Sequence, residues 1–99
     1  MNVVIQKRNK TTEEGVSFPA LQCWNPVTKV ATIAAEFSGR RVSCRIKIAD
    51  LNKKYKITTD EPMQSITNYR TEIESVIREL ISKKSFEEDG SIMISYDDL

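Results

Sequence analysis

The sequence contains no histidine among its 99 residues. Histidine is the commonest general base of enzymes and the commonest metal ligand in proteins. Its absence excludes a Ser-His-Asp triad and a Cys-His pair, and two cysteines alone cannot complete the usual tetrahedral zinc site. Acid–base chemistry by carboxylates or lysine is not excluded. From this composition we expect a protein that is not an enzyme and that holds no cofactor and no metal.

Cysteine, glycine and proline are also scarce, with two, three and three residues. Cys23 and Cys44 are too few for a disulfide framework, and the low glycine and proline content is typical of a chain that folds. Residues 1–6 lack the apolar stretch of a signal peptide, and no run is long enough to span a membrane. We therefore expect one domain over residues 1–99, with residues 1–15 partly mobile, in the reducing cytoplasm and away from membranes.

The strongest β pattern of the sequence covers residues 30–48. With Ser38-Gly39 as a two-residue turn, alternate positions of the two arms fall on opposite sides of a hairpin. One side then collects the apolar and small residues Ala31, Ile33, Ala35, Val42, Cys44 and Ile46. The other side pairs Glu36 with Arg41, Thr32 with Arg45, and Val30 with Lys47. The register therefore predicts one buried and one charged face.

The remaining elements follow from shorter patterns. Residues 16–18 alternate as a strand does, and residues 50–55 suit one or two helical turns. From Ile66 to about Lys84, apolar residues recur at three- and four-residue intervals, which predicts a long amphipathic helix. Residues 91–96 alternate again and predict a last strand. The expected fold is α+β: a small antiparallel sheet of three to five strands, with one long amphipathic helix and a short helix packed on one face.

Four groups of residues together resemble a known family. They are Val16-x-Phe18-Pro19 with Trp24-Asn25; Ile33-x-Ala35-x-x-x-Gly39-x-x-Val42-x-Cys44-x-Ile46 with Leu51 and Tyr55; Asn68-x-Arg70-x-x-Ile73-Glu74; and Gly90-x-Ile92-x-Ile94 with Asp97. The set is similar to a small bacterial family of uncharacterised α+β proteins, domain of unknown function 1488. The resemblance covers residues 16–99. It implies a fold and a bacterial origin, and it assigns no activity.

Charge is divided unevenly along the chain. Residues 1–57 hold 11 basic and 4 acidic side chains, a net of +7, whereas residues 58–99 hold 4 basic and 10 acidic ones, a net of −6. One hypothesis is a nucleic-acid contact made by Arg40, Arg41, Arg45 and Lys47. The alternative is that the acidic half neutralises the basic half, within one molecule or across a dimer. The near-neutral pI of about 7.7 favours the alternative.

Arg70 and Glu74 lie one helical turn apart beside the apolar stripe of the predicted helix. They form either a polar site at the edge of the helix–sheet interface or an i,i+4 ion pair whose stems cover the core. The ion pair is the favoured interpretation. The predicted function is a small non-enzymatic interaction or regulatory protein, with a protein partner or self-association. Nucleic-acid association is the alternative, and a carboxylate- or lysine-dependent enzyme is the third hypothesis.

Overall fold

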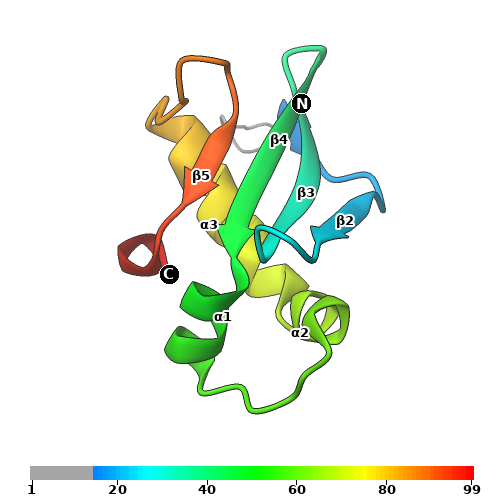
Figure 1. The fold of residues 1–99 in the computed structure, drawn as a ribbon. Helices are drawn as coiled ribbons and strands as arrows, with labels where there is room; N and C mark the ends of the chain where they lie inside the picture. Colours follow the sequence, from blue (N-terminus) through cyan, green and yellow to red (C-terminus); the bar gives the residue numbers. More distant parts are fainter. Residues whose placement is uncertain (1–14) are drawn as a thin grey trace, which may run out of the picture.

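The computed structural model describes residues 15–99. They form a five-stranded sheet in the order β1-β3-β4-β5, with β2 also beside β3. In Figure 1, α3 runs behind the sheet, and α1 and α2 lie at its lower end. The predicted α+β class is confirmed. The predicted mobility of residues 1–15 falls outside the described residues, except for Gly15.

The central hairpin consists of β3 (Val30–Phe37) and β4 (Arg40–Lys47). Its register is the predicted one, with Ile33 opposite Cys44 and Glu36 opposite Arg41. Ser38 and Gly39 have φ values of 54° and 76°. Both central residues of a type I′ turn need a positive φ, and this turn suits the twist of a two-residue hairpin. The sequence pattern therefore predicted both the strands and the turn.

Two further strands pair antiparallel with β3. β1 (Val16–Ser17) lies in the predicted place, whereas β2 (Gln22–Asn25) was not predicted. The chain turns at Asn25, whose side-chain oxygen accepts hydrogen bonds from the backbone N–H groups of Val27 and Thr28 at 2.9 and 3.2 Å. Such an Asx turn stabilises a sharp reversal of the chain. It connects β2 to β3.

The last strand, β5 (Ile92–Ile94), lies beside β4 and runs parallel to it. This differs from the predicted all-antiparallel sheet, so the sheet is mixed. The reason is the connection: the chain leaves β4 through α1, α2 and α3 before it returns. A long crossover returns a strand in the same direction, whereas a tight turn reverses it.

The helices are α1 (Ile48–Tyr55), α2 (Pro62–Asn68) and α3 (Arg70–Ser82). The predicted long amphipathic helix is interrupted at Tyr69, where φ is −109° and ψ is 19°. The Tyr69 ring stacks on Tyr55 with centroids 4.3 Å apart, so the break places an aromatic side chain against α1. The apolar intervals continue on both sides of Tyr69, which is why the sequence pattern shows no break there. A short 3-10 helix, η3 (Tyr96–Asp98), follows β5.

The hydrophobic core lies between the sheet and the helices. Its fully buried side chains include Ile33, Cys44, Ile46, Leu51, Ile66, Ile73, Ile77, Ile92 and Ile94. Each buried Leu or Ile contributes about 1.5–3 kcal/mol relative to an exposed one. Within residues 15–99, no helix has the length and apolar character needed to cross a membrane. The opposite face of the sheet carries none of the described helices.

Candidate functional site

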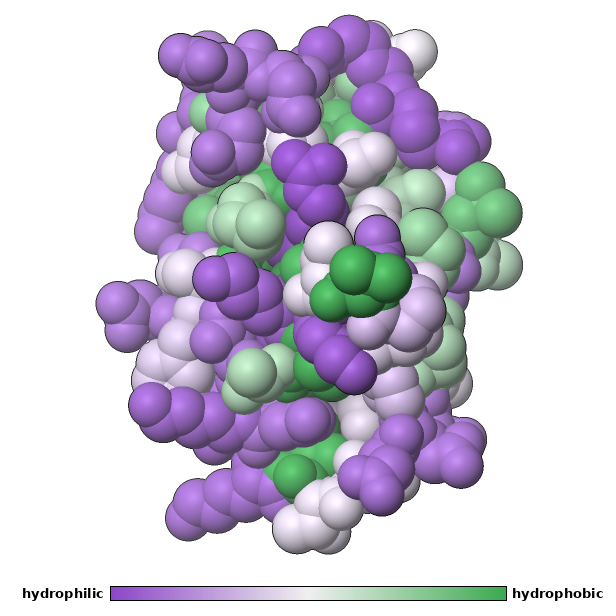
Figure 2. All heavy atoms as spheres, in the orientation of Figure 1, coloured by the Kyte–Doolittle hydropathy of each residue, from purple (hydrophilic) through white to green (hydrophobic). Residues whose placement is uncertain are grey.

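This second face, called the outer face, is the candidate functional surface. Strand alternation and the pairing register assign to it Ser17, Cys23, Asn25, Val30, Thr32, Ala34, Glu36, Arg41, Ser43, Arg45, Lys47 and Met93. Figure 2 views the molecule from this side and shows small hydrophobic groups scattered among hydrophilic residues. The surface is therefore mixed in character.

Two cations of the outer face are paired with acidic side chains. The Arg41 guanidinium lies 2.8 Å from Oε2 of Glu36. Nη2 of Arg45 donates to Oγ of Ser91 at 2.7 Å and lies 3.6 Å from Oδ2 of Asp89. Hydrogen bonds from the hydroxyl and the backbone N–H of Ser91 lower the pKa of Asp89, and Arg45 lowers it further. Asp89 is therefore a carboxylate at neutral pH.

Arg40 and Lys47, the other two residues of the nucleic-acid hypothesis, take part in neither of these contacts. Arg40 shares its parity with the buried residues of β4, and its guanidinium lies 5.9 Å from the centroid of the Phe86 ring. Lys47 is on the outer face and makes no ion pair with any residue between 15 and 99. Three of the four cations thus share a face, and neighbouring acids neutralise two of those three. This geometry supports charge compensation within one molecule.

Arg70 and Glu74 form an ion pair that also holds the start of the sheet. Nε of Arg70 donates to Oε2 of Glu74 at 2.7 Å. The same guanidinium donates to Oε1 of Gln22 at 2.5 Å and to the carbonyl of Pro19 at 2.9 Å. The pair lies on the helix side of the sheet, with side-chain exposures of 18% and 22%. Arg70 therefore ties α3 to the segment between β1 and β2.

Arg78 extends this cluster along α3. Its guanidinium lies 4.0 Å from Glu74 and 5.0 Å from the centroid of the Phe18 ring. The sequence shows the i,i+4 spacing of Arg70 and Glu74. No local pattern indicates that Arg70 also contacts Gln22 and Pro19. These partners are 48 and 51 positions away from Arg70. Because the cluster's hydrogen bonds are satisfied internally, it serves to position chain segments.

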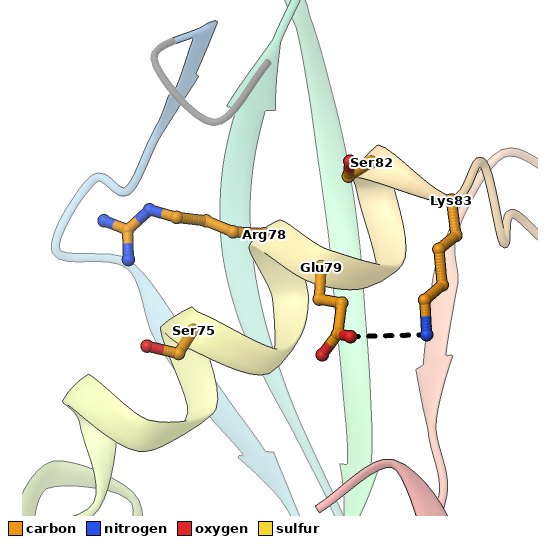
Figure 3. A pocket seen from close by; sticks show the side chains of 5 residues that line it. All are labelled: Ser75, Arg78, Glu79, Ser82 and Lys83. Atoms are coloured by element: carbon orange, nitrogen blue, oxygen red, sulfur yellow. Dashed lines mark ion pairs between the residues drawn. The ribbon is translucent and has the colours of Figure 1, made fainter. Parts of the chain in front are cut away.

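A shallow hollow of about 450 Å³ lies along the solvent side of α3 (Figure 3). Its described lining consists of Ser75, Arg78, Glu79, Ser82 and Lys83, all from this helix or its C-terminal end. Figure 3 shows Lys83 turned toward Glu79, and their charged atoms lie 3.3 Å apart. Arg78 points away from both toward the start of the sheet. The Glu79 carboxylate is thus already matched by a cation.

A second hollow, of about 330 Å³, lies on the outer face. Asn25, Thr28, Val30, Thr32, Arg45 and Met93 line it. We call it the outer-face hollow. It combines the apolar side chains of Val30 and Met93 with the guanidinium of Arg45. An aliphatic side chain that ends in an acidic group matches this lining.

The two cysteines lie on opposite faces of the sheet. Cys44 is buried in the core, and this burial raises the pKa of its thiol to about 12. Cys23 is exposed on the outer face. In the described part of the chain, no three His, Cys, Asp or Glu side chains are grouped as a metal site requires. Cys44 acts as a small core side chain, which is the usual role of a buried thiol.

Comparison with known proteins agrees with this fold. The model of a family described as "Protein of unknown function (DUF1488)" matches residues 13–94. A crystal structure of a protein of unknown function from this family, from Shewanella loihica PV-4, has a TM-score of 0.75 and 18% sequence identity. The alignment covers 88% of this chain and 97% of that one. No curated protein matches. The family match over most of the sequence shows that the chain belongs to the DUF1488 family.

Proposed function

We propose that this chain is a non-enzymatic interaction protein that binds a protein partner through its outer face. The observation that carries the proposal is that the helices of residues 15–99 cover only one face of the sheet. The described helices contribute Leu51, Ile66, Ile73 and Ile77 to a core on the inner face. The opposite face carries Cys23, Ser43 and Met93 at its surface. Figure 1 shows this face in front of α3.

The shape of the outer face supports a protein partner. Ala34 and Ser43, which lie opposite each other on β3 and β4, give its centre short side chains. The outer-face hollow lies toward one end, and the Glu36–Arg41 pair lies toward the other. Short side chains at the centre, with a hollow toward one end and an exposed ion pair toward the other, support shape complementarity to another folded surface.

The charges of the outer face favour protein over nucleic acid. Binding to a phosphate backbone needs several cations that can release counterions. Here Arg41 and Arg45 already have acidic neighbours.

The exposed and buried thiols, Cys23 and Cys44, suit a reducing compartment. We therefore propose that the protein acts in the cytoplasm.

A matched pair of variants tests the proposal. Ser43→Arg places a long cation at the centre of the outer face, whereas Ser75→Arg places the same cation on the solvent side of α3. The full chain, immobilised, is used to capture proteins from lysate of its source cells, and the captured proteins are quantified by mass spectrometry. We expect a stoichiometric partner with the wild type and with Ser75→Arg, and its loss with Ser43→Arg. Equal capture by both variants would contradict the assignment to the outer face.

A further inference from the structure

We infer that the hollow between the β2–β3 turn and α1 binds a free apolar amino acid in its zwitterionic form. We call it the end hollow, and its volume is about 180 Å³. It shares no lining residue with the outer-face hollow. The inference therefore goes beyond the proposed protein partner and is independent of it. The lining of the end hollow includes Trp24, Lys29, Ile48, Asn52, Asp60 and Pro62.

The fold brings distant parts of the chain together at this hollow. Trp24 lies opposite the buried Ala31 in the β2–β3 register and faces the helices with it. Lys29 ends the turn between β2 and β3, and its carbonyl accepts a hydrogen bond at 3.0 Å from the backbone N–H of Ile48. Because Ile48 is the first residue of α1, this bond holds the turn beside the helix. In Figure 1 the hollow lies at the lower end of the sheet, near α1 and α2.

Two opposite charges line the end hollow without pairing. Lys29 supplies an ammonium group and Asp60 a carboxylate, and both residues are exposed. Neither makes an ion pair with any residue between 15 and 99. A ligand with a carboxylate for Lys29 and an ammonium group for Asp60 satisfies both through charge-assisted hydrogen bonds. A simple anion or cation is attracted by one of these residues and repelled by the other, so the pair favours a zwitterion.

Asn52 provides a third polar contact. Its Oδ1 atom is buried and accepts no hydrogen bond from the described part of the chain. A buried acceptor without a donor is destabilising. The terminal torsion of asparagine has a broad energy minimum, so the amide can turn toward a donor in the hollow at little cost. The ammonium group of an amino acid has three N–H donors, which is enough for both Asp60 and Asn52.

The remaining wall of the hollow is apolar. Trp24 and Ile48 are partly buried and pack against the core, and Pro62 begins α2. These side chains suit the aliphatic side chain of the ligand. The volume corresponds to about six water molecules at about 30 Å³ each, which is less than the roughly 300 Å³ of the smallest sites for drug-sized ligands. An amino acid of the size of valine or leucine therefore matches the site, with an expected dissociation constant between roughly 10 μM and 1 mM.

Trp24 is the only tryptophan in the sequence, so its fluorescence reports on the end hollow directly. Titration of the full chain with L-leucine should change this fluorescence saturably, and isothermal titration calorimetry should give the same dissociation constant. Leucine amide lacks the carboxylate and N-acetyl-leucine lacks the ammonium group. Each should bind at least about fivefold more weakly than leucine, because each loses one charge-assisted contact. Equal affinity for all three ligands would contradict recognition of a zwitterion.

A matched pair of lysine variants tests the site itself. Lys29→Gln should raise the dissociation constant for leucine about fivefold to tenfold. Lys56→Gln should leave it unchanged, because Lys56 is also exposed and has a similar φ of 54° but does not line the hollow. Asp60→Asn should weaken leucine, but it should not weaken N-acetyl-leucine, which has no ammonium group to lose. Thermal unfolding shows that the variants fold.

Asn52→Leu separates binding from stability. It removes the unpaired acceptor, so the melting temperature without ligand should stay the same or rise, while leucine binding weakens. If neither fluorescence nor calorimetry detects leucine up to about 10 mM, a concentration well above the expected range, the hollow holds water only and the inference is overturned. Unchanged affinity in Lys29→Gln, Asp60→Asn and Asn52→Leu also overturns it. None of these substitutions is on the outer face, so capture of a protein partner should persist in all three, and the two proposals can fail separately.

Discussion

The two faces of the β3–β4 hairpin are built from alternating residues of the same strands, yet one face is buried and the other is exposed. On the inner face, Ile33, Cys44 and Ile46 are 0% exposed and form part of the core. On the outer face, the side chains of Glu36 and Arg41 are 46% and 49% exposed. The inner face thus supplies most of the stability, and the outer face is the surface that we propose binds a partner. Substitutions on the two faces should differ accordingly.

The largest contrast is expected for the two thiols. Because the thiolate is the reactive form, Cys44, with its pKa raised to about 12 by burial, should react only when the structure opens. Cys23, exposed on the outer face, should react at once. Titration of the native protein with a disulfide reagent should show one fast thiol and one slower by orders of magnitude. In Cys23→Ser the fast phase should be absent, and two fast thiols in the native wild type would contradict the assignment.

The next largest effect is expected for a core truncation. Ile46→Ala removes buried apolar volume from the inner face, and such truncations cost about 2–5 kcal/mol. Ser43→Ala, three residues earlier on the outer face, should change the free energy of unfolding by at most about 0.5 kcal/mol. Urea unfolding at low protein concentration measures both. Similar losses for the two variants would show that the faces are not distinct in stability.

An intermediate effect is expected for Arg70 compared with Arg41. Arg70→Ala removes donors from Glu74, Gln22 and Pro19 in a partly buried cluster, which should cost about 1–3 kcal/mol. Arg41→Ala breaks an exposed pair and should cost less than about 1 kcal/mol.

The substitution Arg70→Lys provides the control for geometry. A lysine keeps the charge but cannot reproduce the forked set of donors. It should therefore recover only part of the stability in the same urea measurement. Full recovery would mean that the positive charge alone matters at this position.

The smallest effect is expected from the titration of Asp89. Its pKa is lowered in the folded state, so its stabilising contribution is present above the ordinary value of 3.8 and is lost as the pH falls through the lowered value. Asp89→Asn removes the charge but keeps an oxygen that can accept from Ser91. The wild type should melt slightly higher than this variant at neutral pH, and the difference should close in acid. A difference that is constant with pH would contradict this account.

The success of the sequence-based predictions depended on how local each feature is. The hairpin register followed from alternation and from the Ser38-Gly39 turn, both of which act within a few residues. β2 was missed because Gln22–Asn25 is short and its alternation is weak. Its pairing with Ile33 and Ala31 on β3 is a tertiary contact that the sequence does not show. The parallel direction of β5 depends on a crossover of three helices. No local pattern specifies how such a connection returns.

The candidate site shows the same division. Alternation alone places Arg41, Arg45 and Lys47 on one face and Arg40 on the other, so the separation of Arg40 could have been read from the sequence. The neutralisation of Arg45 could not, because Asp89 is far from it along the chain and approaches it only through the β4–β5 pairing. The Arg70 contacts with Gln22 and Pro19 likewise depend on long-range packing.

By itself, the sequence determined that no histidine chemistry takes place here, that residues 30–47 form a hairpin with one apolar face, and that charge is divided between the two halves. These features follow from composition and from steric rules that act over a few neighbours. The tertiary structure alone decided that Asp89 of the acidic half lies beside Arg45 on the outer face and that one face of the sheet lies without helices from the described chain. Both depend on how distant segments pack, and the free energy of that packing is spread over the whole core.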